Sequence, residues 1–211
     1  MARGTTSGVP SAASRGVAGF VALVAAVTLA TRLYLRLEQS DGLLDALAYM
    51  SQYFTILTNA ITFLVLAWIA AGRDLPPRWI KAVVIAIACV GVVYHSLLAH
   101  LVNLNGLELW ADHGTHTFVP ILTVAWWIFL APKPDYRTRD LPLWIAWPSV
   151  YCVYILTRAS YSGFYPYPFL NVPEIGWGGL ARAVGGLLLG FVLVGLVLGW
   201  SGRLAAGRAA N

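Results

Sequence analysis

Long apolar segments constrain this chain more than any other feature, because about 20 apolar residues are enough to cross a bilayer. The chain has 211 residues, of which 59% are apolar and 11% are charged, and its mean hydropathy is +0.71. Soluble domains carry about 25% charged residues. Six segments are long and apolar enough, or nearly so, to cross a membrane: 16–37, 47–71, 79–101, 115–131, 141–158 and 178–201. The sequence therefore predicts an all-α polytopic membrane protein, a bundle of six transmembrane helices.

The basic residues predict the orientation of this bundle. Ten of the 14 Lys and Arg residues fall beside the two termini and in the second and fourth connections, and four fall on the other side. Cytoplasmic connections of membrane proteins are rich in Lys and Arg, so we expect both termini to be cytoplasmic. The basic residues flank helices and do not gather on one face, which excludes the usual pattern of a nucleic-acid-binding protein.

Small and polar residues mark the two ends of the chain. We expect a disordered cytoplasmic tail at 1–14, a six-helix transmembrane domain at 15–201 and a second cytoplasmic tail at 202–211. The first basic and apolar residues also resemble a signal peptide, but the apolar run continues to Leu35, which favours a first membrane helix. Cys89 and Cys152 fall inside predicted helices, where cysteine usually behaves as a small apolar residue.

Histidine is confined to one short part of the sequence. All four histidines lie between positions 95 and 116, where the third and fourth apolar segments meet. Ionisable groups near the bilayer are costly and commonly mark a functional site. The alternative is a set of interfacial histidines that only face headgroups and water.

The second apolar segment carries a polar stripe. Gln52, Thr55, Asn59 and Thr62 recur at spacings of three, four and three, which puts them on one face of a helix. Such a face must contact protein or water, because amides exposed to hydrocarbon have no partner. The stripe either lines a cavity or hydrogen-bonds to neighbouring helices.

The fourth segment opens with Asp112 and His116, which are four residues apart and can therefore meet on a helix surface. A carboxylate in this position can hold an imidazole in one orientation, as a catalytic base requires. His113 lies three residues before His116 and is predicted on the same side. His95 and His100 are five apart and diverge by about 140°, so we do not expect them to hold one ion together.

The fifth segment carries a further polar face, of which Tyr151, Tyr154 and Arg158 are the outer part. With His95, these residues are candidates to line a substrate cavity. Arg158 either extends to the headgroups or binds a carboxylate in the cavity. The next loop, 161–170, contains five aromatic residues in ten; it is either an interfacial aromatic belt or a lid over an outward-facing cavity.

Three motifs together resemble a known family. They are Tyr-Phe-Thr-Ile-Leu-Thr-Asn at 53–59, His-Gly-Thr-His-Thr-Phe-Val-Pro at 113–120 and Tyr-Pro-Tyr-Pro-Phe at 165–169. The pattern resembles the androgen-induced-protein family of multi-pass membrane hydrolases, and most closely its bacterial six-span relatives, which implies a bacterial inner membrane. The interval from the histidine to the proline is one residue shorter than in the eukaryotic pattern, and Asp112 replaces the usual asparagine.

The resemblance implies a chemistry and a set of residues. Eukaryotic members are intramembrane threonine hydrolases that cleave fatty acid esters of hydroxy fatty acids. Their nucleophile corresponds to Thr55 and their essential histidine to His116. In the implied mechanism His116 is the general base, while Asn59 or Gln52 donates a hydrogen bond to the oxyanion. Asp112 and His113 would support this pair, and no metal or cofactor is required.

The sequence thus predicts a lipid-ester hydrolase whose active site opens toward the outer face, and whose substrate is a membrane lipid or fatty acid ester. Two other classes remain open. One is a haem- or metal-binding membrane protein that uses histidines of the third and fourth segments as ligands. The other is a non-enzymatic protein that binds or transports lipid in the same cavity.

Overall fold

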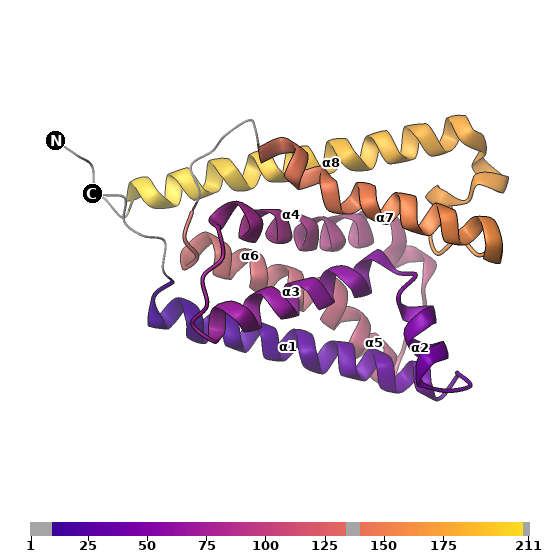
Figure 1. Ribbon diagram of the computed structural model, residues 1–211, viewed down its shortest axis with the longest axis horizontal. Coiled ribbons are helices and arrows are strands. Elements are labelled where there is room, and N and C mark those ends of the chain that lie inside the picture. Colours follow the sequence, from indigo (N-terminus) through magenta and orange to yellow (C-terminus); the bar gives the residue numbers. More distant parts are fainter. Residues whose placement is uncertain (1–9, 134–139, 209–211) are drawn as a thin grey trace.

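Helices that run side by side along one axis form this protein (Figure 1). The structure is a computed structural model that describes residues 10–133 and 140–208, with side chains as far as Ser201. Throughout these described ranges the only regular elements are helices, which confirms the all-α prediction. The long elements are α1 (Ala12–Leu37), α3 (Phe54–Ala70), α4 (Pro77–Val93), α6 (Val119–Phe129), α7 (Leu141–Ser162) and α8 (Val172–Arg208).

Several of these helices are long and apolar enough to cross a membrane. Among the described residues they are 12–37, 77–101 and 172–201, and a fourth candidate is formed if two bent helices between 43 and 70 count as one span. The segments predicted to be the fourth and fifth spans are helical, but they are not among these candidates. The prediction of a membrane helix bundle is therefore confirmed, and the number of six spans stays a prediction.

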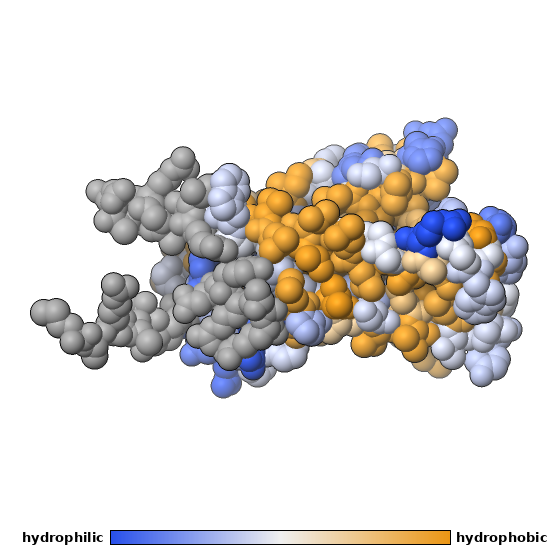
Figure 2. Space-filling view, turned by 90° about the horizontal axis from the view of Figure 1, so that it is seen from above, coloured by the Kyte–Doolittle hydropathy of each residue, from blue (hydrophilic) through white to orange (hydrophobic). Residues whose placement is uncertain are grey.

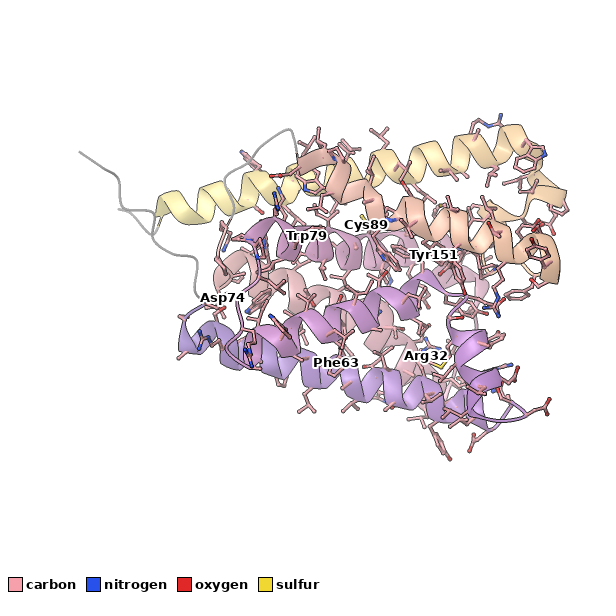
Figure 3. The ribbon with its side chains drawn as sticks, viewed as in Figure 1. Arg32, Phe63, Asp74, Trp79, Cys89 and Tyr151 are labelled. Carbon is pink, nitrogen blue, oxygen red and sulfur yellow. The ribbon has the colours of Figure 1, made fainter. Side chains whose placement is uncertain are left out.

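The two ends of the bundle differ. The start of α1, the connection between α3 and α4 and the ends of α6 and α8 lie together (Figure 1), so the connections predicted to be cytoplasmic share one end. Asp74 and Trp79 lie toward this end, whereas Arg32 and Tyr151 lie toward the other (Figure 3). On the face shown in Figure 2, apolar residues cover the middle between these ends.

The described residues include the inner parts of both ranges predicted as tails. α1 begins at Ala12, where the hydroxyl of Ser11 accepts a hydrogen bond from the backbone N–H of Ser14, and α8 continues to Arg208. Helical residues thus extend into both predicted tails, while 1–9 and 209–211 lie outside the described residues. Most of the fourth connection, at 134–139, also lies outside them.

A sharp bend interrupts the second predicted span. Helix α2 (Leu43–Met50) meets α3 at 99°, so the span predicted as continuous over 47–71 is broken between Met50 and Phe54. The bend frees backbone carbonyls that a helix would have paired, and α7 satisfies one of them, because the hydroxyl of Tyr151 donates to the Gln52 carbonyl at 2.6 Å.

Two π-helical turns face each other near the same end. The turn η1 (Tyr94–Leu98) continues α4 into the short 3-10 helix η2 (Ala99–Leu101). The turn η3 (Gly114–Phe118) joins α5 (Gly106–His113) to α6. Pro120 has no N–H to give to the carbonyl four residues before it, and in η3 the N–H of Val119 bonds to the Gly114 carbonyl. Such π-turns are frequent at functional sites.

The aromatic loop after α7 packs back onto the bundle. It contains the short 3-10 helix η5 (Pro168–Leu170). Tyr167 and Leu170 are buried in a cluster with Tyr151 and Ile155 of α7, while Tyr161 in the last turn of α7 is 87% exposed. Apolar packing therefore fixes the loop against α7 at this end of the bundle.

Candidate active site

Thr55 and His116, 61 residues apart in the sequence, meet toward the end of the bundle where Arg32 and Tyr151 lie. The His116 Nε2 atom lies 3.3 Å from the Thr55 hydroxyl oxygen. Because α3 begins only at Phe54, Thr55 stands in the first helical turn. The bend between α2 and α3 thus brings Thr55 to the level of His116.

Asp112 holds the other side of the imidazole, as its spacing predicted. The His116 Nδ1 atom lies 3.1 Å from Asp112 Oδ1 and 3.2 Å from the Asp112 carbonyl oxygen. The Asp112 side chain is buried. Hydroxyl, imidazole and carboxylate therefore form a continuous chain, an arrangement that activates a hydroxyl nucleophile in hydrolases of unrelated folds.

Two residues that the sequence analysis missed hold the carboxylate. Arg32 of α1 donates to Asp112 Oδ1 at 2.7 Å, and the hydroxyl of Tyr94 donates to Asp112 Oδ2. The ring of Tyr94 also stacks on the His116 ring, with 3.8 Å between centroids and 10° between planes. Arg32 carries no local sequence signal for this role, because its partner is 80 residues away. For Tyr94 the available signal was its position next to His95 in the sequence.

Glycine permits these helices to approach the site. A Cβ atom on Gly114 would overlap the side chain of Thr28 in α1. A Cβ on Gly91 of α4 would lie 3.2 Å from the His116 carbonyl oxygen and 3.2 Å from the Pro120 Cβ. The glycine within the His-Gly-Thr-His motif is therefore needed for close packing of η3 against α1.

The polar stripe of α3 turns inward, as predicted, but its members have different roles. All four of its residues are buried. The Asn59 amide nitrogen donates to the carbonyls of Thr55 (2.8 Å) and Thr115 (3.1 Å), while Thr62 donates to a carbonyl of its own helix. Gln52 donates to the Tyr49 carbonyl at 3.3 Å. Both amides predicted as oxyanion donors thus bind backbone, and Asn59 ties α3 to η3.

Other hydrogen-bond donors stand beside Thr55. The hydroxyl of Tyr167, from the aromatic loop, lies near the Thr55 hydroxyl and the backbone of Phe54 and Thr55. Burial raises the pKa of Tyr167, so this hydroxyl stays protonated at neutral pH. The first backbone N–H groups of a helix have no partner within it, and the side chain of Tyr53 does not cap α3.

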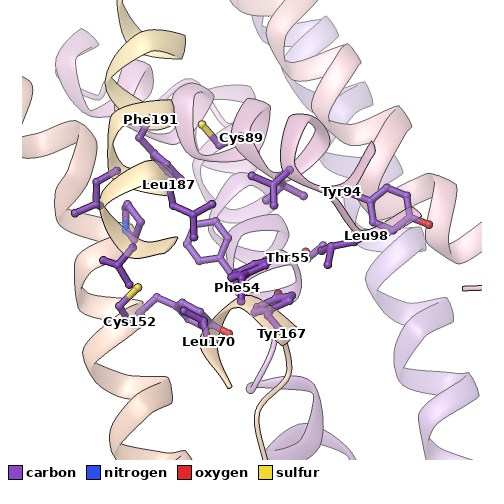
Figure 4. Close-up of a pocket in the computed structure, with 17 residues that line it drawn as sticks. Phe54, Thr55, Cys89, Tyr94, Leu98, Cys152, Tyr167, Leu170, Leu187 and Phe191 are labelled. Atoms are coloured by element: carbon purple, nitrogen blue, oxygen red, sulfur yellow. The ribbon is translucent and has the colours of Figure 1, made fainter. Parts of the chain in front are cut away.

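Two cavities meet at Thr55. The first is apolar and narrow, about 60 Å³, and lies between α4, α7 and α8; Figure 4 shows Phe54, Thr55, Tyr94, Leu98 and Tyr167 at one part of its wall and Cys89, Leu187 and Phe191 at another. The second is wide, about 440 Å³, and is lined by polar and charged residues that include Arg32, Arg36, Glu108, Asp112 and His116. Thr55, Tyr94, Leu98 and Tyr167 line both.

Some predicted cavity residues lie elsewhere. Four residues were predicted to line the cavity, namely His95, Tyr151, Tyr154 and Arg158. Of these, only Tyr151 lines a cavity at Thr55. Arg158 donates to the hydroxyls of Ser51 (3.1 Å) and Tyr154 (3.0 Å), so this pair braces α7 against the end of α2. The predictions for Tyr154 and Arg158 as cavity residues are therefore corrected: the break of the second span at Ser51 gives them partners outside the cavity.

The remaining histidines also lie outside the two cavities. His95 is exposed, and its Nε2 lies 3.0 Å from the Thr117 hydroxyl. His113 Nδ1 lies 3.5 Å from the same hydroxyl, away from His116, because a π-turn advances by a smaller angle per residue than the α-helix assumed for the three-residue spacing. His95 is thus not a cavity residue, and His113 does not contact Thr55 or His116 directly.

Metal or haem ligation finds little support in these side chains. Within the ranges that the structure describes, no three His, Cys, Asp or Glu side chains are close enough to hold a metal ion. Both ring nitrogens of His116 already face partners, Thr55 on one side and Asp112 on the other. An axial bond from His116 would therefore break one of these contacts.

Comparison with known proteins bears on the same site. No curated protein and no solved structure gives a significant match. A family model described as FAR-17a/AIG1-like protein matches residues 91–199, which is more than half of the chain. The matched region contains Tyr94, Asp112, His116 and Tyr167, and α3 with Thr55 precedes it. The chain therefore belongs to the FAR-17a/AIG1-like protein family.

Proposed function

We propose that this protein is an intramembrane hydrolase that cleaves lipid esters with Thr55 as nucleophile and His116 as general base. Membership of a family of membrane lipid hydrolases supports the reaction class. The observation that carries the assignment is the 3.3 Å contact between the Thr55 hydroxyl and His116 Nε2, with Asp112 on the far nitrogen. A threonine hydroxyl is a weak nucleophile until a base takes its proton.

The reaction proceeds in two steps. Thr55 Oγ1 attacks the ester carbonyl carbon while its proton passes to His116 Nε2. The bond from carbon to the alcohol oxygen then breaks, and His116 returns the proton to the departing alcohol. Water next attacks the acyl-threonine, giving one proton through His116 to Thr55 and releasing the acid. Asp112 keeps the imidazole oriented and balances its positive charge.

The oxyanion is assigned to donors other than the amides expected from the sequence. Asn59 and Gln52 bind backbone carbonyls. The Tyr167 hydroxyl and the first N–H groups of α3 stand beside the nucleophile. Donors fixed before the reaction are worth on the order of 100-fold or more in rate, and the positive end of the α3 dipole adds to them.

We further propose that both termini are cytoplasmic and that the active site opens toward the outer face. The ten-to-four distribution of basic residues supports this orientation. The site also lies at the end of the bundle opposite the connections rich in Lys and Arg (Figure 1). In a bacterium this places the protein in the inner membrane, with its substrate in the outer leaflet.

The test is replacement of the nucleophile by an isosteric residue. Thr55→Val keeps the shape of the side chain and removes the hydroxyl, so we expect ester hydrolysis and fluorophosphonate labelling to fall by about 10³-fold or more. Thr55→Ser should retain part of the activity. Thr62→Val is the matched control, because Thr62 is buried on the same helix but bonds only to the carbonyl of Thr58.

Each outcome has a definite meaning. Full hydrolysis by a folded Thr55→Val variant contradicts the nucleophile assignment, and a labelled peptide without Thr55 identifies another nucleophile. A folded wild-type protein that binds fatty acid esters and hydrolyses none of a broad panel is the non-enzymatic lipid-binding protein.

A further inference from the structure

Thr55 stands where two cavities of opposite character meet. The narrow cavity is apolar along its whole length, apart from Thr55 and the tyrosine hydroxyls. The wide cavity carries charged groups. An ester whose carbonyl carbon lies against Thr55 therefore has one half in each cavity, and the chemistry decides which half lies where.

The position of His116 determines which half of the ester lies in which cavity. It lines the wide cavity and not the narrow one. In the acylation step His116 must deliver its proton to the alcohol oxygen as the ester bond breaks, so the alcohol has to lie on the side of His116. Resting on the function proposed above, we propose that the acyl chain occupies the narrow apolar cavity and the alcohol half occupies the wide charged cavity.

The narrow cavity limits the length of the acyl chain. Cys89 of α4 precedes Tyr94, the first residue of η1, by five residues, so it lies roughly 7.5 Å farther along the helix axis at 1.5 Å per residue. Leu187 and Phe191 of α8 line the same deep part (Figure 4). A cavity of about 60 Å³ is small when a single water needs at least about 10 Å³. The cavity therefore accepts a short acyl chain, and Leu187 and Phe191 restrict longer ones.

The wide cavity offers one cation to the alcohol half. Arg32 is occupied by Asp112 at 2.7 Å. Among the described residues the ion pair of Arg36 is with Asp45, at 4.0 Å, and the Asp45 side chain is 53% exposed. Glu108, which lines the wide cavity together with the Asp112 carboxylate, is exposed.

Arg36 is also held in place for a ligand. Its guanidinium lies 3.6 Å from the centroid of the Tyr49 ring, and its buried Nε has no hydrogen-bond partner within the described residues. A carboxylate or phosphate on the alcohol would supply the missing acceptor, and Arg binds both in a bidentate way. Arg36 is thus the residue that selects an anionic alcohol.

The two assignments predict separate effects. One experiment tests both, because it combines two alcohols with a series of acyl chains. The probes are acyl esters of 4-hydroxybenzoate, which is anionic, and of methyl 4-hydroxybenzoate, which is neutral, with acyl chains from butanoyl to dodecanoyl. Hydrolysis of each is measured with the purified full-length protein. The ratio of kcat/KM between the two alcohols reports on the wide cavity, and the preferred acyl length reports on the narrow one.

Changes in α8 should move only the acyl preference. Phe191→Ala should shift the optimum to longer chains, and Leu187→Trp should shift it to shorter ones. Each methylene that gains or loses room should change kcat/KM on the order of 10-fold. Leu189→Trp is the matched control, because Leu189 is on the same helix but 58% exposed.

Changes at Arg36 should move only the alcohol preference. Arg36→Gln should lower kcat/KM for the anionic esters about 10-fold or more, the loss expected for a hydrogen bond to a charged group, and spare the methyl esters. Arg36→Lys should recover part of the loss. Arg182→Gln, an exposed arginine of α8 outside both cavities, is the control.

The reverse result would overturn the proposal. If Arg36→Gln moves the acyl optimum while Phe191→Ala and Leu187→Trp alter the preference for charge, the ester lies the other way round. If neither preference moves in folded variants, the cavities do not hold the substrate. Both results leave the hydrolase proposal intact as long as hydrolysis still depends on Thr55; activity that survives in Thr55→Val contradicts that proposal instead.

Discussion

At the scale of single residues, one buried carboxylate organises the site. Asp112 accepts hydrogen bonds from Arg32 of α1 and Tyr94 of η1, and it orients His116 of η3. Burying an unpaired charge costs several kcal/mol, so these partners are needed for Asp112 to remain a carboxylate. The orientation of the proposed base, His116, therefore depends on Arg32 and Tyr94 as well as on Asp112.

Tyr94→Phe tests this dependence. The variant keeps the ring that stacks on His116 and lines both cavities, but it loses the hydroxyl that donates to Asp112. We expect kcat to fall by about 10-fold or more, the loss expected for a hydrogen bond to a charged group, with KM nearly unchanged. Steady-state kinetics on one ester measures both constants; a raised KM with normal kcat would contradict a positioning role.

The sequence predicted the local part of this site and missed the distant part. Thr55 and His116 followed from motifs, and the contact of Asp112 with His116 followed from a four-residue spacing. Arg32 could not be found, because nothing in a single sequence reports a contact over 80 residues. Arg158 was misplaced for a related reason: its face of α7 was known, but the position of Ser51 against that face was not.

At the scale of helices, departures from regular α-helix place the reacting groups. The bend before α3 puts Thr55 in a first turn, and the π-turn η3 directs His116 toward it. The apolar pattern predicted that helices exist at these positions. It did not predict the bend, because residues 51–53 (Ser-Gln-Tyr) contain neither glycine nor proline, and the partners that stabilise the bend come from α7.

Gly114→Ala should disturb the packing of η3 against α1. Its methyl group would overlap the side chain of Thr28, and overpacking of this kind costs about 1–3 kcal/mol. We expect a lower Tm in thermal unfolding of the purified protein, with hydrolysis reduced in parallel.

Two further variants show whether the overlap is the cause. Gly186→Ala in α8 is the control, because a Cβ there meets nothing within 4 Å, and alanine favours a helix by up to about 1 kcal/mol over glycine. The double variant Thr28→Ala with Gly114→Ala should recover part of the lost Tm. An equal Tm for Gly114→Ala and wild type would show that the backbone yields without cost.

At the scale of the whole molecule, polarity is divided along the axis of the bundle. Apolar side chains cover the middle of the face shown in Figure 2, the connection between α3 and α4 lies at one end (Figure 1), and Arg32, which binds Asp112, lies toward the other (Figure 3). The sequence predicted this division from hydropathy and from the count of basic residues. The two cavities were beyond prediction, because their walls combine residues from helices whose relative positions only the fold determines.

Reporter fusions test the proposed topology. A fusion after Gly72 should report a cytoplasmic location, whereas fusions after Gly106 and Gly163 should report an external one, because basic connections stay in the cytoplasm. Together these positions sample three connections of the six-span arrangement. A cytoplasmic signal after Gly106 would rule out the arrangement and would place the site on the inner side of the membrane.

The junction at Thr55 also bears on how a lipid would reach the site. An ester bound as proposed has its acyl chain along the helix axes and its alcohol half toward water. A lipid has the same arrangement in a membrane leaflet. Little hydrophobic transfer energy is then gained or lost on binding from the bilayer, whereas a chain arriving from water gains about 0.8 kcal/mol per CH₂. For lipids supplied in vesicles, the binding affinity of the ester should therefore vary little with the length of its acyl chain. The preference for one chain length should appear in kcat.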